Sequence, residues 1–361
     1  MLNDIFMAKI LVDLTPLYNR KLTGVEIYGI EFYEALKKTN HEIIPVFRKE
    51  NLIDTNSNAI IINCENRFLV ENIYLSCVVR KIKPNVAFFP IFPPPIDLLY
   101  SNIKIVPTLH DLAFLYFRET LSFSARLYLK PKCNLALKRS YKILSVSNTV
   151  KNEISQISNI PVINCGENIS RLYDIAPSYE FDKSILERLG VNENDYLVTV
   201  STLEPRKNFG YLLDVFQGIH KVYPDLKLVL VGRKGWGNDK KFNYKIAELG
   251  DSIVCSGYIS DDDLISLYHY SKAFMLFSLY EGFGRTPVEA LACGANVIVS
   301  DIPVFHEVLG NNVHYVPLNN RELAVNYIVE NINVKISNEI NPSIFNILDV
   351  NITRDIDNII M

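Results

Sequence analysis

The stretch Ala273-Phe-Met-Leu-Phe-Ser-Leu-Tyr-Glu-Gly-Phe-Gly-Arg-Thr-Pro-Val-Glu-Ala290 reads as a strand, a turn and the start of a helix. Its first five residues are continuously apolar, which is typical of a strand buried on both faces of a parallel sheet. Gly282 and Gly284 permit the unusual backbone angles of a tight turn, and Pro287 suits the first turn of a helix. A helix that starts after a glycine turn is a ready site for an anion.

The same order of strand, loop and helix recurs on both sides of this stretch. Further apolar runs in the second half cover residues 197–200, 228–231, 253–255 and 297–299. Similar runs in the first half cover residues 10–12, 43–47, 59–62, 86–89, 103–109 and 143–146. This alternation predicts an α/β fold with two doubly wound, parallel-sheet, Rossmann-like domains that face a central cleft.

Length and composition agree with two domains. At roughly 150 residues per domain, 361 residues predict about two. We expect a first domain over residues 1–175, a second over 176–345, and a tail over 346–361 that forms a helix crossing back to the first domain. A content of 48% hydrophobic and 21% charged residues excludes wholesale disorder.

Charge and cysteine usage narrow the class of protein further. A net charge of -3 argues against nucleic acid as a partner. No Cys-x-x-Cys pair occurs, and the first residues do not resemble a signal peptide, so we expect reduced thiols and a cytoplasmic location. No apolar run reaches the ~18 residues of a membrane span.

Charged residues follow several of the predicted strands. Glu281 and Glu289 lie on the two sides of the glycine turn, and Arg206 and Lys207 lie before another helix. Two cations at a helix start suit a diphosphate, and Glu289 suits ligand hydroxyls. The alternatives are a solvated basic turn capped by Asn208, and carboxylates that interact only with a helix terminus.

Two other groups have plainer explanations. The acidic run at residues 261–263 has the residue type of a metal site, but it follows Ser260 at a predicted helix start, so capping explains it better. His110 follows a strand and suits either a sugar contact or a structural role. No Ser-His-Asp or Cys-His arrangement is evident, and we expect no bound metal and no cofactor.

Together these segments resemble the family-4 retaining glycosyltransferases of the GT-B fold. The most specific part is the pair of glutamates around Gly-Phe-Gly, and bacterial O-antigen and capsule mannosyltransferases resemble the chain most. The resemblance covers most of the chain and rests on Thr23-Gly24-Val25, His110-Asp111-Leu112, Ser145-Val-Ser147, Glu204-Pro-Arg-Lys-Asn208, residues 232–236, Gly257-Tyr258 and Glu281-Gly-Phe-Gly with Glu289. Ser201-Thr202 stand where many members have Gly-Arg.

The resemblance implies a role for each matching residue. It implies that His110 and Glu281 make catalytic contacts with the transferred sugar. It also implies that Arg206 and Lys207 bind the diphosphate. Binding of the nucleotide-sugar donor is further implied for Gly24 near the diphosphate, Tyr258 near the base, Gly282, Phe283 and Gly284 near the hexose, and Glu289 at the ribose. Fixed cations stabilise the leaving diphosphate without a metal.

The function that the resemblance implies is retaining transfer of a hexose, with GDP-mannose as the favoured donor. The nucleotide sugar is a co-substrate, and the acceptor is a saccharide, expected to be lipid-linked, in surface polysaccharide synthesis. UDP-glucose, UDP-N-acetylhexosamine and deoxysugar donors stay open. Two alternatives are a nucleotide-sugar epimerase of the same fold and a non-catalytic two-domain sugar-binding protein.

A basic segment in the first half suggests contact with a membrane. Residues 118–142 contain seven cations and one acid, interleaved with aromatic residues. Such a segment is typical of a surface that binds anionic lipid, and it predicts a peripheral protein at the inner face of the cytoplasmic membrane. The alternative is an ordinary solvated helix face. The predicted membrane and acceptor patch contains Arg118, Arg126, Lys130 and Lys132.

Overall fold

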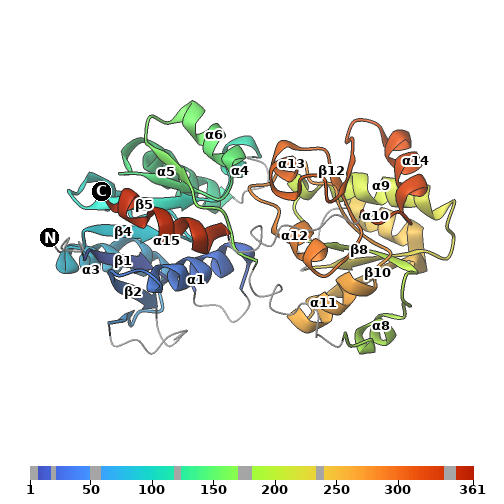
Figure 1. Cartoon of the computed structure of the whole chain (residues 1–361), viewed down its shortest axis with the longest axis horizontal. Coiled ribbons are helices and arrows are strands. Elements are labelled where there is room, and N and C mark those ends of the chain that lie inside the picture. The colour runs from blue at the N-terminus through green and yellow to red at the C-terminus, as the bar shows by residue number, and fades with distance from the viewer. Residues whose placement is uncertain are drawn as a thin grey trace. The chain divides into compact units, whose positions relative to one another are not determined.

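The computed structural model describes residues 7–17, 22–48, 58–117, 123–169, 181–232, 240–336 and 347–361. The chain divides into two units. Unit 1 comprises Met1–Asn168 and Ser343–Met361, and unit 2 comprises Ile169–Pro342. The first change of unit therefore falls after Asn168, seven residues before the expected position, and the chain returns to unit 1 after Pro342 (Figure 1).

Unit 1 contains a seven-stranded parallel sheet in the order β3-β2-β1-β4-β5-β6-β7. Its strands are β1 (Lys9–Asp13), β2 (Glu42–Arg48), β3 (Ile60–Ile62), β4 (Val86–Phe89), β5 (Lys104–Leu109), β6 (Ile143–Ser145) and β7 (Val162–Asn164). The six runs expected in this half are confirmed as strands. The edge strand β7 was missed because it has three half-buried residues and no apolar run.

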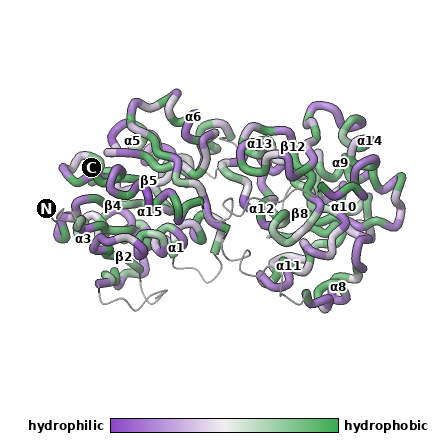
Figure 2. The backbone as a smooth tube through the Cα atoms, viewed as in Figure 1, coloured by the Kyte–Doolittle hydropathy of each residue, from purple (hydrophilic) through white to green (hydrophobic). Residues whose placement is uncertain are grey.

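Helices surround this sheet. They are α1 (Gly24–Lys37), α2 (Arg67–Leu69), the π-helical turn η1 (Val70–Tyr74), α3 (Leu75–Ile82), η2 (Ile96–Tyr100), α4 (Ala113–Tyr116), α5 (Phe123–Arg139), α6 (Asn148–Ile157) and α15 (Ile347–Ile360). Hydrophobic and hydrophilic stretches alternate along the backbone (Figure 2), as expected for helices with one face on a core.

Unit 2 contains a six-stranded parallel sheet in the order β10-β9-β8-β11-β12-β13. The strands are β8 (Tyr196–Val200), β9 (Lys227–Val231), β10 (Ile253–Gly257), β11 (Ala273–Leu276), β12 (Val297–Ser300) and β13 (His314–Val316). The helices are α8 (Ser184–Leu189), η4 (Pro205–Lys207), α9 (Phe209–His220), α10 (Lys240–Leu249), η5 (Gly250–Ser252), α11 (Asp261–Tyr270), α12 (Arg285–Ala292), α13 (Pro303–Leu309) and α14 (Arg321–Asn331).

The core of unit 2 follows from the hydrophobic pattern. Five apolar residues that recur at helical spacing are all buried in α9: Phe209, Leu212, Leu213, Phe216 and Ile219. They pack with the buried apolar residues of β8, β9 and β11. The fold class of two doubly wound α/β domains is confirmed, and β13 was missed because its sequence, His314-Tyr315-Val316, forms no continuous apolar run.

The last helix, α15, belongs to unit 1 and packs beside α1 (Figure 1). Asn168 holds its first turn, because Oδ1 of Asn168 accepts the amides of Leu348 at 2.9 Å and Asp349 at 3.2 Å. Nδ2 of Asn168 donates to Oδ1 of Asp349 at 2.9 Å. Asp349 also pairs with Lys38 of unit 1 at 2.5 Å. The residue that ends the first part of unit 1 therefore anchors the helix that completes it.

We predict that Asn168→Ala lowers the free energy of unfolding by about 1–3 kcal/mol, because two amides at the start of α15 lose their acceptor. Chemical denaturation measures the change. The control is Thr353→Ala, on an exposed position of α15 whose hydroxyl donates only to the Asp349 carbonyl, and it should stay within about 0.5 kcal/mol of wild type. Equal losses in the two variants would contradict the anchoring role of Asn168.

Candidate active site

The strand order of unit 2 reverses between β8 and β11. In a parallel sheet, the loops at the carboxyl ends of the two strands at such a point diverge and leave a crevice, where ligands bind. The loop after β8 contains Arg206 and Lys207, and the loop after β11 contains Glu281. The fold therefore places these three charged residues at the edge of the sheet where ligands usually bind.

Arg206 and Lys207 lie in the short turn η4, which precedes α9. Asn208 joins the two elements in a left-handed conformation with φ of 54°, which asparagine tolerates better than most residues. Its side chain makes no capping hydrogen bond, which counts against the alternative of a basic turn whose helix is capped by the Asn208 side chain. The residue instead turns the chain sharply, which brings η4 back towards the loop after β11.

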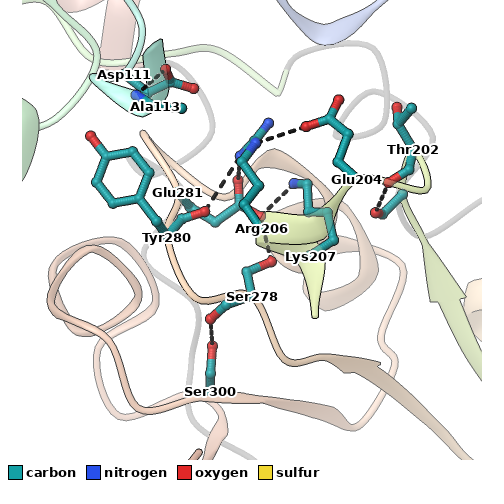
Figure 3. A network of polar contacts seen from close by, with 11 residues as sticks. Asp111, Ala113, Thr202, Glu204, Arg206, Lys207, Ser278, Tyr280, Glu281 and Ser300 are labelled. Atoms are coloured by element: carbon teal, nitrogen blue, oxygen red, sulfur yellow. Dashed lines mark hydrogen bonds and ion pairs between the residues drawn. The ribbon is translucent and has the colours of Figure 1, made fainter. Parts of the chain in front are cut away.

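Glu281 pairs with both cations (Figure 3). Its side chain is 6% exposed, and its Oε2 lies 2.9 Å from Nη1 of Arg206. Its Oε1 accepts from Nζ of Lys207 and, at 2.7 Å, from the hydroxyl of Ser278. The backbone reinforces the contact, because the amide of Leu279 donates to the carbonyl of Arg206 at 2.8 Å.

Further polar contacts hold the same cluster in place. Nε of Arg206 lies 2.8 Å from Oε2 of Glu204, so this guanidinium bridges two carboxylates. The Ser300 hydroxyl donates to the Ser278 carbonyl at 2.7 Å, which links the cluster to β12 (Figure 3). Two cations and two carboxylates therefore form one network whose parts come from three strand ends.

The electrostatics keep Glu281 ionised. Burial alone would raise the pKa of this carboxyl. The cations Lys207 and Arg206 outweigh burial, together with hydrogen bonds from Lys207 and Ser278, and they lower the pKa from 4.5 to about 2. The carboxylate is thus charged at any physiological pH and fixes both cations.

The turn between Glu281 and α12 is built on glycine. Gly284 has φ of 95°, and a Cβ atom there would lie 2.5 Å from the Phe305 ring. Phe283 is buried, and the N-cap position of α12 is Gly284, which has no side chain that could cap the helix. Glu289 lies one turn into α12, where its Oε1 accepts from Nε of Arg285 at 3.2 Å. The glycine turn followed by a helix, which the sequence predicts, is therefore confirmed.

Two predicted contacts lie farther out in unit 2. Tyr258 follows β10, an edge strand two positions from β8, and is 57% exposed. At ~4.8 Å per strand, that is about 10 Å from the end of β8. Gly232 directly follows β9 with φ of 147°, and a Cβ atom there would meet the Ser201 carbonyl at 2.1 Å. Residues 233–239, including Trp236, lie outside the described part of the chain.

The acidic run at 261–263 forms the first turn of α11, and the Ser260 hydroxyl accepts the Asp263 amide at 3.2 Å. Asp263 also pairs with Arg188. The capping interpretation is therefore confirmed. Among the described residues, no group of three or more His, Cys, Asp or Glu side chains is arranged to hold a metal ion.

The strand order of unit 1 reverses between β1 and β4, and a pocket of about 350 Å³ lies there. Its lining includes Thr23, Arg67, Phe92, Thr108, His110 and Asp111. Nε2 of His110 donates to the Pro90 carbonyl at 2.8 Å, and the ring meets Tyr28 edge-on at 4.7 Å. Because a carbonyl only accepts, Nε2 carries the hydrogen, and Nδ1 faces Glu167 at 3.9 Å. His110 thus contributes a ring of fixed orientation to the pocket.

Gly24 is the first residue of α1, beside this pocket. Glu26 follows in the first turn, and its Oε2 accepts the Thr23 amide at 2.7 Å. The start of α1 therefore already has an anionic partner, which weakens its attraction for a second anion. The structure places Gly24 at a strand-to-helix turn, as expected, with a carboxylate beside it.

The predicted membrane patch needs a correction at Lys132. This residue is 1% exposed, and its ammonium donates to the Tyr128 hydroxyl at 2.9 Å inside unit 1. Burial lowers its pKa, opposed mainly by the nearby Glu71 and Asp13 carboxylates. The sequence pattern misled because these acids are distant in the chain. Lys130 is half-buried, and Arg118 and the side chain of Arg126 lie outside the described part of the structure.

Three residues of this region were not predicted from the sequence. Arg67 lines the pocket, and its partner Glu71 is buried. Asp13, at the end of β1, is also buried. The spacing of Arg67 and Glu71 at i and i+4 was the available signal, since such residues are neighbours on a helix.

Comparison with known proteins identifies unit 2. Residues 182–339 match the family described as glycosyl transferases group 1. This match covers most of unit 2, which we call the group 1 domain. This domain contains the whole cluster of Arg206, Lys207 and Glu281. Among the described residues, no helix is both long and apolar enough to span a membrane.

The group 1 domain accounts for part of the similarity to curated proteins. The O-antigen chain mannosyltransferase RfbU of Salmonella typhimurium is 32% identical over 211 residues, 58% of this chain and 55% of that protein. O-antigen chain mannosyltransferase B of Escherichia coli is 29% identical over 217 residues, 58% and 56% of the two chains. The chain spans about half the length of these relatives. The expected resemblance to bacterial O-antigen mannosyltransferases is confirmed.

Solved structures extend the likeness to both units. HepE of Anabaena, in complex with UDP and glucose, superposes with a TM-score of 0.68 at 17% identity over 98% of this chain and 97% of that one. WaaG, a glycosyltransferase involved in lipopolysaccharide biosynthesis, gives 0.66 at 10% identity over 96% and 95%. This likeness shows the GT-B fold.

We predict that Glu281→Gln destabilises the protein most at neutral pH. Because folding lowers the pKa of Glu281 from 4.5 to about 2, its ionised form contributes about 3 kcal/mol above pH 4.5, and this contribution falls as pH drops towards 2. Denaturant titrations from pH 7 to pH 3 should show the gap between wild type and variant narrowing. The exposed Glu330→Gln is the control. A gap that does not change with pH would contradict this account.

Proposed function

We propose that the chain is a retaining glycosyltransferase that moves a hexose from a nucleotide-diphosphate sugar to a saccharide acceptor in surface polysaccharide synthesis. The observation that supports this best is the cluster of Arg206, Lys207 and Glu281 at the β8–β11 crevice of the group 1 domain. Mannose from GDP-mannose is the favoured donor, because two of the relatives above are O-antigen mannosyltransferases.

The chemistry proposed for the cluster is electrostatic. Transfer breaks the bond between the sugar C1 and the diphosphate oxygen, so negative charge develops on the leaving diphosphate. Arg206 and Lys207 stabilise this charge, and because Glu281 fixes both cations beforehand, little reorganisation is needed during the reaction. Departure and attack on one face of the sugar retain the configuration, so no protein nucleophile is required.

The remaining contacts follow the order of the elements around the crevice. Glu281 and the turn of Gly282, Phe283 and Gly284 bind the donor hexose, and Glu289 binds the ribose hydroxyls. Tyr258 lies farther out, beside the base. In unit 1, the roles proposed for His110 and Gly24 are contacts with the transferred sugar and with the diphosphate, and the pocket is the proposed acceptor site.

The test is to incubate the protein with GDP-mannose, UDP-glucose and UDP-N-acetylglucosamine, with and without a saccharide acceptor, in excess EDTA. We predict release of free nucleotide that requires the acceptor and survives chelation, because protein cations supply the positive charge. An epimerase would convert the donor without an acceptor, and a binding protein would bind sugar without turnover; either result would replace this proposal. Loss of turnover that magnesium or manganese restores would contradict metal independence.

We also propose that unit 1 docks peripherally on the cytoplasmic face of an anionic membrane, where a lipid-linked acceptor is available. Supporting residues on the described surface are the exposed Lys138 and Arg139 at the end of α5. The guanidinium of Arg139 lies 4.1 Å from the centre of the exposed Tyr100 ring, and such rings favour the headgroup region.

Liposome co-sedimentation tests this docking. We predict that binding rises with anionic lipid, falls at high salt, and drops in the double variant Lys138→Ser and Arg139→Ser, since each cation near such a surface contributes about 1 kcal/mol. The control is Lys221→Ser, an exposed cation of unit 2. Equal binding by the double variant and the control would rule out this surface.

A further inference from the structure

Arg67 lies at the rim of the unit 1 pocket, with its side chain 46% exposed. Two independent contacts fix its guanidinium. The group stacks over the Phe92 ring, 4.7 Å from the ring centre, and its Nε donates to Oε1 of Glu71. Within the described part of the chain, its two terminal amino groups make no hydrogen bond. Arg67 therefore presents a planar pair of donors, already oriented, beside a cavity.

Glu71, which holds Arg67, is itself held by a buried network. Its side chain is 6% exposed, and its Oε2 accepts from the Tyr128 hydroxyl at 2.9 Å. That hydroxyl in turn accepts from Nζ of Lys132 at 2.9 Å and from Nδ2 of Asn72 at 2.7 Å. Both carboxylate oxygens of Glu71 are paired, one with Arg67 of α2 and one with Tyr128 of α5, so these contacts fix its position.

Burying the charged side chains of this network costs desolvation free energy. Glu71, Lys132 and Asp13 are all buried charged residues in one part of unit 1, and apolar residues of similar volume often give equal or greater stability. Glu71 also lies in the π-helical turn η1, and such turns occur frequently at functional sites. Both observations indicate that the position of Arg67 matters more than the stability of its support.

The pocket chemistry indicates what Arg67 binds. A guanidinium donates two parallel N–H groups and so matches two neighbouring oxygen atoms. Glu26 and Asp111 line the same pocket, and both carboxylates accept backbone amides there, at 2.7 Å from Thr23 and at 2.9 Å from Ala113. The two carboxylates would repel an anion. A neutral polyol can donate hydrogen bonds to them and accept hydrogen bonds from Arg67.

A buried hydroxyl at the pocket points to the same ligand class. Thr108 lines the pocket and is 4% exposed, and its Oγ1 has no partner of good hydrogen-bond geometry. The Tyr28 hydroxyl is its neighbour, and the two hydroxyls interact with each other. A hydroxyl both donates and accepts, so Thr108 keeps capacity for a polar ligand that reaches this wall of the pocket.

We propose that Arg67 is a specificity-determining residue that binds two adjacent hydroxyl oxygens of a neutral sugar unit of the acceptor, and that Glu71 and Tyr128 position it. This inference rests on the proposed function, because it assigns the acceptor to the unit 1 pocket. Arg67 would favour a sugar with two suitably placed neighbouring hydroxyls over a sugar that lacks them.

Steady-state kinetics of Arg67→Lys and Arg67→Ala test the assignment. Both variants should raise the KM for the acceptor about tenfold or more, since lysine keeps the charge but loses the planar pair of donors. The KM for the donor should stay unchanged. The control is Arg80→Ala, on the neighbouring helix α3, whose arginine pairs with Asp97 at 2.9 Å. Wild-type acceptor KM in both Arg67 variants would overturn the proposal.

Tyr128→Phe tests the positioning part, because it removes the hydroxyl that joins Glu71 to Lys132. It should raise the acceptor KM with little change in kcat or in the donor KM, an effect that a general loss of stability would not give. If it lowers the melting temperature but leaves the acceptor KM unchanged, the network serves stability alone and the positioning role is wrong.

A binding measurement without turnover separates this inference from the proposed function. Saturation-transfer NMR with methyl α-mannoside should show contact with the neutral sugar, reduced in Arg67→Ala and retained in Arg80→Ala, and isothermal titration with inorganic phosphate should show no binding. Contact with phosphate alone would overturn the neutral-sugar assignment. If wild type binds the sugar through Arg67 but transfers nothing to any acceptor, the proposed transfer fails while the binding site stands.

Discussion

All strands of a parallel sheet end at the same edge, and a reversal of strand order leaves a crevice there. This constraint places both candidate sites of the protein. In unit 2 the reversal between β8 and β11 brings Arg206 to Glu281, residues 75 positions apart in the chain. In unit 1 the reversal between β1 and β4 opens the pocket beside His110 and Arg67. Residues distant in sequence meet because their strands are neighbours.

Two buried carboxylates show how direct contact decides charge inside these units. Glu281 touches two cations, and its pKa is lowered to about 2 although burial opposes this. Asp13 is equally buried, but its hydrogen bonds come from the amide and hydroxyl of Thr15. Burial therefore dominates and raises its pKa to about 6, with Glu71 adding to the effect and Lys132 opposing it. The first arrangement keeps a fixed charge, and the second keeps a group that can change its charge near neutral pH.

The sequence predicted the fold well because its main signals are local. Continuous apolar runs mark buried parallel strands, and the turn at Gly282–Gly284 marks the step from β11 to α12. The loops of Arg206 and Glu281 were also predicted to be functional, but their mutual ion pairing was not. That pairing depends on which strands are neighbours, and a strand pattern alone does not specify sheet order.

The errors have the same physical origin. Lys132 reads as a surface cation because α5 contains many charges, but its partner Glu71 comes from another helix, 61 positions earlier in the chain. The pocket role of Arg67 depends on Phe92, which arrives from the end of β4. Long-range partners therefore decide which charged residues are buried and which of them reach a ligand.

The anchoring of α15 by Asn168 has a consequence for biosynthesis. Unit 2 is inserted between Asn168 and the segment that contains α15, so the first unit is discontinuous in the chain. Because domains generally fold as units during synthesis, the group 1 domain has all of its residues before unit 1 has its last helix. Until α15 emerges from the ribosome, the face of α1 that it covers stays exposed to solvent and to other chains.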